Sequence, residues 1–200
     1  MDTENKISYY RFDNQRHNNS DVQSLIHTIN LHGKNLIGIE VGIGKALSFC
    51  SILQNCPNVK ELHGVDSWKP YLDYIKDPYD GTPSYAVDDK NIECIKLLAY
   101  HNIKFSGNKE KAIIHEKDSN EVVKNFKNET FDFIFLDTYL TLEQAKNDIK
   151  VWYPKLKKKG LFTGHDWSAS VIQIAVNEFR KKNKIKSTLT AFDNCYAWIK

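Results

Sequence analysis

The stretch Asn35–Ala46 (NLIGIEVGIGKA) places a short apolar run directly before two alternate glycines. The run stops at Gly42, which is typical of a buried β-strand that ends in a tight glycine turn. The segment that follows, residues 45–55, has the apolar spacing of a helix. A strand, a glycine turn and a helix in this order indicate an α/β fold with a ligand site at the turn.

The glycine turn matches neither of two familiar phosphate-binding patterns. A dinucleotide fingerprint needs a small residue three positions after the second glycine, where this chain has Leu47. A phosphate loop needs Ser or Thr after its lysine, whereas Lys45 is followed by Ala46, and the glycine spacing also differs. A ligand without a pyrophosphate group therefore fits the turn better, and a turn that binds no ligand is the structural alternative.

Short apolar runs alternate with helical periodicity along the rest of the chain. We expect strands at 35–41, 61–66, 111–116, 131–137 and 160–165, and helices at 21–33, 45–55, 85–100, 120–126, 142–152 and 169–182. Two further β-like runs, 187–192 and 195–199, close the chain without a helix between them. This order predicts a Rossmann-like, doubly wound, mostly parallel seven-stranded sheet with a C-terminal antiparallel strand and helices on both faces.

The composition indicates one ordered domain with an N-terminal extension. Of the 200 residues 41% are hydrophobic, and no apolar run is long enough for a transmembrane helix. We expect an N-terminal arm and capping helix at 1–33 and one domain at 34–200. The polar start has no signal-peptide core and the four cysteines form no CxxC pair, so we expect a cytoplasmic protein. Tyr9, Tyr10 and Phe12 in the arm offer apolar surface for a homo-oligomer.

The charge is nearly balanced, with 28 basic and 25 acidic residues. Only three of the basic residues are arginines (Arg11, Arg16 and Arg180), the residue type that dominates recognition of bases and phosphates. Lysines cluster at 155–159 and 180–186, but such runs are usually solvated faces. The composition therefore argues against a nucleic-acid partner.

An acidic residue, Asp66, ends the second expected strand, 24 residues after Gly42. In open α/β sheets ligands bind beyond the carboxyl ends of the strands, and an acid there can accept hydrogen bonds from the hydroxyls of a ribose. On its own, an aspartate at a strand end is usually a turn or helix cap. Together with the glycine turn, Asp66 predicts a nucleoside site on the first two strands.

At these residues the chain resembles the class I S-adenosylmethionine-dependent methyltransferases. Glu40, Gly42, Gly44 and Ala46 match the family's first motif, with Ala46 in place of its last glycine. The resemblance covers about residues 34–200. It implies that the glycine loop wraps the methionine part of S-adenosylmethionine, that Asp66 holds the ribose and that Asp118-Ser119 approaches the adenine. The cofactor-binding residues that it implies are Glu40, Gly42, Gly44, Ala46, Ser48, Asp66, Ser67, Trp68, Asp118, Ser119 and Asp137.

Two later segments extend the resemblance. Residues 131–137 (FDFIFLD) resemble the motif IV strand of the family. The end of the fifth expected strand, Gly164-His165-Asp166-Trp167, is similar to that of small O-methyltransferases. Several of these relatives act on sugars or other small hydroxyl compounds, and some need magnesium. The resemblance thus implies methylation of a hydroxyl on a small molecule such as a sugar.

Three polar residues at the ends of neighbouring strands, Asp137, His165 and Asp166, are the candidate catalytic residues. A hydroxyl acceptor must lose its proton during methyl transfer, and His165 could be the base. Alternatively, Asp137 and Asp166 bind Mg²⁺ through oxygen, which would lower the pKa of the acceptor. A purely structural role of His165 is the third reading.

The residues after Asp137 depart from the pattern of related small O-methyltransferases, which often carry an acidic, histidine-containing stretch there. This chain has Thr138-Tyr139-Leu140-Thr141, which removes candidate ligands and bases, and Tyr139 could line the acceptor pocket instead. A catalytically inactive module that binds S-adenosylmethionine is therefore one alternative. A nucleic-acid methyltransferase is another, although the chain lacks the Asn/Asp-Pro-Pro-Tyr motif typical of amine methylation. The aromatic loop at 67–83 could cover the acceptor.

Overall fold

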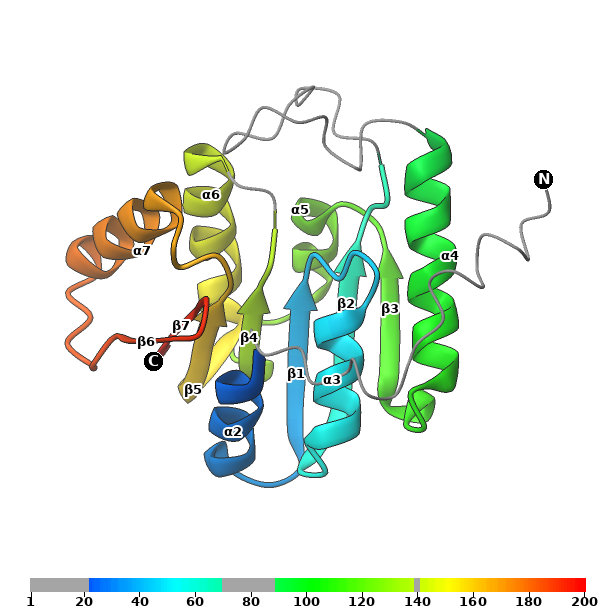
Figure 1. Ribbon diagram of the computed structural model, residues 1–200. Helices are drawn as coiled ribbons and strands as arrows, with labels where there is room; N and C mark the ends of the chain where they lie inside the picture. Colours follow the sequence, from blue (N-terminus) through cyan, green and yellow to red (C-terminus); the bar gives the residue numbers. More distant parts are fainter. Residues whose placement is uncertain (1–21, 70–88, 139–140) are drawn as a thin grey trace.

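The computed structural model describes residues 22–69, 89–138 and 141–200 (Figure 1). In these residues seven strands form one sheet, in the order β3-β2-β1-β4-β5-β7-β6. The strands are β1 (Leu36–Val41), β2 (Val59–Asp66), β3 (Ala112–Glu116), β4 (Phe131–Leu136), β5 (Leu156–Gly164), β6 (Thr190–Phe192) and β7 (Cys195–Ile199). Neighbours from β3 to β5 are parallel, and β7 is antiparallel to β5 and β6. The predicted sheet is therefore confirmed.

Helices cover both faces of the sheet (Figure 1). One face carries α2 (Gln23–His32), α3 (Leu47–Asn55) and α4 (Asp89–Phe105), and the other carries α5 (Ser119–Val122), α6 (Leu142–Trp152) and α7 (Ser170–Lys182). Single 3₁₀ turns connect described elements at Lys109–Lys111, Val123–Asn125 and Tyr153–Lys155. Among the helices of the described ranges, none is long and apolar enough to cross a membrane.

Alternating side chains of the central strands fill the two cores. Phe133 and Phe135 of β4 enter the core beneath α3, whereas Ile134 enters the core beneath α6 and α7. All three are fully buried, and each such side chain stabilises the fold by about 1.5–3 kcal/mol. A strand with both faces covered reads as a continuous apolar run, which is why 131–137 is so clear in the sequence.

The helix α2 belongs to the first of these cores. Its residues Leu25 and Ile29 are fully buried and share a core with α3. The Asn58 amide nitrogen donates to the Ile29 and Gly33 carbonyls, both at 2.8 Å, and so ties the end of α2 to the start of β2. The arm residues Tyr9, Tyr10 and Phe12, on which the homo-oligomer expectation rests, lie outside the described residues.

Several predicted boundaries need correction. The helix predicted at 85–100 extends to Phe105, because Ile103 continues the buried face of α4. The predicted helix at 120–126 is a short α5 followed by a 3₁₀ turn. The strand predicted from residue 160 begins at Leu156, which is buried and pairs with Phe131. Its three lysines, at 157–159, lie where the β4–β5 register shifts, so the apolar pattern is interrupted there.

The glycine turn after β1 lies against the end of β4. Strand β1 pairs with both β2 and β4, so the order in which successive strands are added across the sheet reverses at β1. The Asp137 backbone N–H donates to the Val41 carbonyl at 2.8 Å. A Cβ atom at Gly42 would lie 2.0 Å from the Asp137 carbonyl oxygen, and Gly42 also has a φ of +87°. Gly42 therefore permits both the turn and the close approach of the two strand ends.

We expect Gly42→Ala to destabilise the protein far more than Gly44→Ala. At Gly42 the added methyl meets backbone and the φ is unfavourable, so the combined cost should be about 3 kcal/mol. At Gly44 the φ of +48° is the only obstacle, because no atom lies within 4 Å of the added methyl. Its cost should be about 1 kcal/mol. Denaturant unfolding of both variants measures the difference, and equal losses would contradict the close contact with β4.

Candidate functional site

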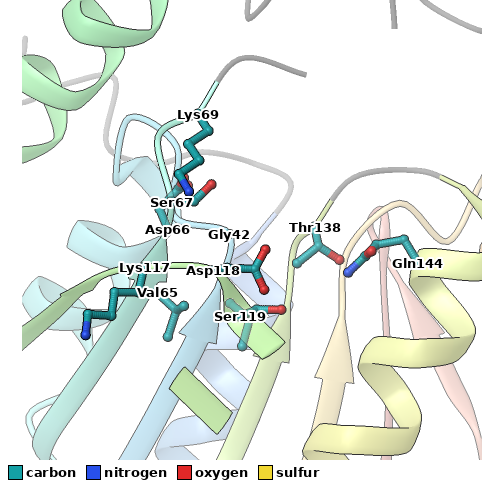
Figure 2. A pocket seen from close by; sticks show the side chains of 11 residues that line it. Gly42, Val65, Asp66, Ser67, Lys69, Lys117, Asp118, Ser119, Thr138 and Gln144 are labelled. Atoms are coloured by element: carbon teal, nitrogen blue, oxygen red, sulfur yellow. The ribbon is translucent and has the colours of Figure 1, made fainter. Parts of the chain in front are cut away.

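A cavity of about 290 Å³ opens at the carboxyl edge of the sheet, beyond β1, β2 and β4 (Figure 2). It lies at the point where the chain order reverses, which is the usual ligand position in an open α/β sheet. Its lining comes from both halves of the sheet: Val41, Gly42, Val65, Asp66, Ser67, Lys69, Lys117, Asp118, Ser119, Thr138 and Gln144. Five of the predicted cofactor residues (Gly42, Asp66, Ser67, Asp118 and Ser119) are among them.

Asp66 holds the glycine loop as well as lining the cavity. Its Oδ2 accepts a hydrogen bond from the Gly44 N–H, and its Oδ1 accepts one from the Trp68 N–H, both at 2.8 Å. Burial raises the pKa of Asp66, while the backbone N–H groups of Trp68 and Gly44 lower it. Each oxygen keeps acceptor capacity beyond its one backbone bond. Asp66 can therefore shape the loop and accept ligand hydroxyls at once.

Six of the predicted cofactor residues do not line the cavity: Gly44, Trp68 and Asp137, and the buried residues Glu40, Ala46 and Ser48. The carboxyl of Glu40 is fully buried, and its Oε1 accepts from the Ser48 hydroxyl at 2.5 Å. Burial raises the pKa of Glu40 well above its ordinary value; the Ser48 bond lowers it, and the nearby carboxylates of Asp137 and Asp66 raise it. Ala46 is buried at φ +59° at the start of α3. These residues support the loop from inside the protein.

Trp68 is also buried instead of offering a stacking surface. Its indole Nε1 donates to the Gly44 carbonyl at 3.0 Å, and its ring packs at 5.6 Å from that of Tyr100. Only 6% of the residue is exposed. The ring of Trp68, predicted to be a cofactor-binding residue, is thus engaged by other residues of the protein. The side chain instead fixes the second glycine of the loop.

Asp118 and Ser119 form the turn between β3 and α5. The Asp118 Oδ1 accepts from the Asn120 N–H at 2.8 Å and so caps the short helix. Both residues line the same cavity as Asp66 (Figure 2). The structure thus brings the two acidic strand ends, Asp66 and Asp118, to one cavity.

The three candidate catalytic residues form one cluster. The His165 Nδ1 lies 3.0 Å from the Asp166 Oδ1 and 3.6 Å from the Asp137 Oδ1. One ligand atom from each residue falls within 4.8 Å of the others. Burial raises the pKa of Asp137 from 3.8 to about 6; His165 lowers it, and the carboxylates of Asp166 and Asp66 raise it. The structure therefore brings together the three side chains that follow the neighbouring strands β4 and β5.

The cluster adjoins a second, small cavity that shares Thr138 with the first. This second cavity also contains Asp148 of α6 and Tyr196 of β7. Tyr196 is 2% exposed, and a Cβ atom at Gly164 would lie 2.3 Å from its hydroxyl oxygen. Burial and then the nearby Asp148 carboxylate raise the pKa of Tyr196. Tyr139, expected in the acceptor pocket, lies outside the described residues.

Several lining residues were not predicted from the sequence: Val65, Lys69, Lys117, Thr138, Gln144, Asp148 and Tyr196. Val65, Lys117 and Thr138 are neighbours of predicted residues, so inspecting both sides of each strand end would have found them. Gln144, Asp148 and Tyr196 lie within helix or strand patterns and carry no local signal. Their places depend on how α6 and β7 pack.

The chain matches known methyltransferases in family and in fold. Residues 39–167 match a family model described as a methyltransferase domain. No curated protein matches the sequence. A putative caffeoyl-CoA O-methyltransferase from Staphylococcus aureus has a similar structure, with a TM-score of 0.63 and 15% identity over 90% of this chain and 82% of the other.

Two further solved structures share the fold. A putative O-methyltransferase from Klebsiella pneumoniae has a TM-score of 0.60 and 13% identity over 90% of this chain and 80% of the other. An O-methyltransferase from Bacillus cereus in complex with SAH has a TM-score of 0.61 and 11% identity over 91% of this chain and 81% of the other. The match to the family model covers more than half of the chain, and the fold agrees with it. The chain therefore belongs to the class I S-adenosylmethionine-dependent methyltransferases.

Proposed function

We propose that the protein transfers the methyl group of S-adenosylmethionine to a hydroxyl oxygen of a small molecule, such as a sugar. The observation that carries this proposal is the contact of the His165 Nδ1 with the Asp166 Oδ1 at 3.0 Å, beside Asp137 in the second cavity, which shares Thr138 with the main cavity of about 290 Å³. A histidine held by carboxylates suits removal of a hydroxyl proton. The three solved structures compared above also carry the name O-methyltransferase.

In this proposal the main cavity holds the cofactor. Asp66 accepts hydrogen bonds from the ribose hydroxyls, and the turn at Asp118 and Ser119 lies along the adenine. The glycine loop lies along the methionine part. The carboxylates of Asp137 and Asp66 raise the pKa of Glu40, and that of Asp66 also raises the pKa of Asp137, so these acidic groups lie close together beside the loop. Such an environment favours a sulfonium cation, because opposite charges attract most strongly where water is scarce.

The catalytic step requires the protein mainly to align the acceptor oxygen with the methyl group and to accept the proton of the hydroxyl. Methyl transfer from sulfonium is an in-line displacement, so holding the acceptor oxygen in line with the methyl group supplies much of the rate. When His165 donates its Nδ1–H to Asp166, the neutral ring carries its lone pair on Nε2. Nε2 is then the atom that takes the acceptor proton, and Asp166 and Asp137 stabilise the resulting cation.

A divalent metal at the same cluster is the second candidate. Asp137 and Asp166 would hold it through oxygen with His165 as a third ligand, and the ligand atoms are close enough, within 4.8 Å. Carboxylates suit Mg²⁺, whereas an imidazole nitrogen favours transition metals such as Mn²⁺ or Zn²⁺. When bound, the metal would lower the pKa of the acceptor hydroxyl.

Calorimetric titration with S-adenosylhomocysteine tests the cofactor site. We expect the wild-type chain to bind and Asp66→Ala to weaken binding by about 100-fold, because it removes two charge-assisted hydrogen bonds within the loop as well as the ribose contact. Glu121→Ala, an exposed acid outside the cavity, is the matched control and should bind normally. Wild-type affinity in Asp66→Ala would place the cofactor elsewhere.

Release of S-adenosylhomocysteine in a screen of sugars and phenols tests the catalytic cluster. With a productive acceptor, His165→Ala should lower kcat by about 10²–10⁴-fold, as for other general bases, while cofactor affinity stays near the wild-type value. Chelator treatment should leave the wild-type activity unchanged. Unchanged product formation by His165→Ala would remove the base assignment, and loss of activity to the chelator with recovery on adding Mg²⁺ or Mn²⁺ would support the metal route.

Asp137→Asn should be inactive and yet more stable than the wild type at about pH 8. The folded-state pKa of Asp137, about 6, exceeds its ordinary value of 3.8, so the folded protein holds this proton more tightly than the unfolded chain. The wild type therefore loses stability as the pH rises from about 4 to about 6, and Asn does not. Because the side chain is 30% exposed, solvent screening should keep the gain below about 3 kcal/mol. Thermal unfolding from pH 4 to pH 8 measures this, and a constant difference would contradict the raised pKa.

A further inference from the structure

Asp148 is a fully buried carboxylate in the middle of α6. It accepts three hydrogen bonds from neutral side chains: from the Thr138 Oγ1 to Oδ2 at 2.6 Å, from the Gln144 Nε2 to Oδ1 at 2.8 Å and from the Ser119 Oγ to Oδ1 at 3.4 Å. Burial raises the pKa of Asp148, and these three hydrogen bonds lower it. Burying a carboxylate is costly unless such donors surround it, so its place is not explained by core packing.

The three donors come from three separate elements and meet at the main cavity. Ser119 begins α5, Thr138 follows β4 and Gln144 lies in the first turn of α6. All three line the main cavity, and Figure 2 shows the Thr138 and Gln144 side chains pointing toward one another. Asp148 itself borders the second cavity beside Asp137 and His165. One buried carboxylate is thus bonded both to Ser119, at the proposed adenine position, and to Thr138, which follows Asp137 of the catalytic cluster.

Each hydrogen bond restricts a side chain that would otherwise sample several rotamers. A hydroxyl or amide bonded to a buried carboxylate has one strongly favoured orientation, because charge-assisted hydrogen bonds are stronger than neutral ones. Thr138 directly follows Asp137, so its bond to Asp148 also fixes the chain next to the catalytic cluster. Replacing Asp148 would release all three side chains together.

We propose that Asp148 is a positioning residue that fixes Ser119, Thr138 and Gln144 as one wall of the cofactor cavity. This inference rests on the proposed placement of S-adenosylmethionine in that cavity. Asp148 acts through its three partners. Its loss should weaken cofactor binding through Ser119 and Gln144, and should lower kcat through Thr138 and the adjoining Asp137.

The test compares Asp148→Ala with Asp148→Asn by titration with S-adenosylhomocysteine. Asp148→Ala should raise the Kd at least tenfold. Asp148→Asn should stay within about threefold, because its amide oxygen can still accept from Ser119 and Gln144 while the Thr138 hydroxyl reverses and accepts from the amide N–H. Where a productive acceptor is known, Asp148→Ala should also lower kcat, and Asp148→Asn should restore most of it.

Trp152→Leu is the matched control for stability. Trp152 is fully buried on the same helix but lines neither cavity. It should lower the unfolding temperature by creating a void and leave the Kd unchanged. A wild-type Kd in Asp148→Ala, or an equal rise of the Kd in Trp152→Leu, would overturn the inference. A wild-type chain that binds no S-adenosylhomocysteine would overturn the placement of the cofactor instead, and the inference with it.

A double-mutant cycle keeps the inference falsifiable if Asp148→Ala does not fold. Thr138→Val and Gln144→Met each remove one donor to Asp148 and keep roughly the same side-chain volume. If Asp148 couples these residues, the fold change in Kd of the double variant should differ at least threefold from the product of the fold changes of the two single variants. Effects that multiply independently would show that the two residues act separately, and would overturn the inference.

Discussion

The contact between the Gly42 turn and the Asp137 carbonyl is the constraint on which the site depends. A parallel sheet that reverses its order must bring the ends of β1 and β4 side by side, and here no side chain fits between them. The glycine loop and the catalytic cluster are consequently held by one junction of backbone. In the proposed function, the distance between a cofactor on β1 and β2 and an acceptor beside β4 and β5 is therefore set by the sheet itself.

Around this junction the protein gathers carboxylates. Glu40, Asp66, Asp137 and Asp148 are each buried enough to have a raised pKa. The donors that stabilise them are mostly backbone N–H groups, hydroxyls and an amide. Such donors orient a carboxylate without forming an ion pair with it. A group of buried carboxylates suits the proposed cationic cofactor. Because their pKa values are raised, the same carboxylates lower the stability of the folded protein at neutral pH.

Local patterns in the sequence were sufficient for the architecture and for part of the site. Strand β4 and helix α6 were predicted with nearly their observed bounds, because continuous apolar runs and helical spacing arise within one element. Gly42, Asp66, Asp118 and His165 were predicted to lie at one edge of the sheet because the ends of parallel strands share that edge, and each lines one of the two cavities there. The packing of the Trp68 ring on Tyr100 was not predicted, since no local signal tells an exposed aromatic ring from a buried one. His63 and His115, far apart in sequence, contact each other at 2.9 Å only because β2 pairs with β3.

The sequence by itself determined the alternation of strands and helices, the glycine turn and the acidic strand ends, because each depends on neighbouring residues and on the backbone they permit. Only the tertiary structure decided which of these residues line a cavity. Glu40 and Ser48 are buried inside the protein. Gln144 lines the main cavity and Asp148 lines the second cavity, although both belong to a helix with no motif of its own. The physical reason is that burial and hydrogen-bond partners depend on the packing of distant elements, and a local pattern does not contain that packing.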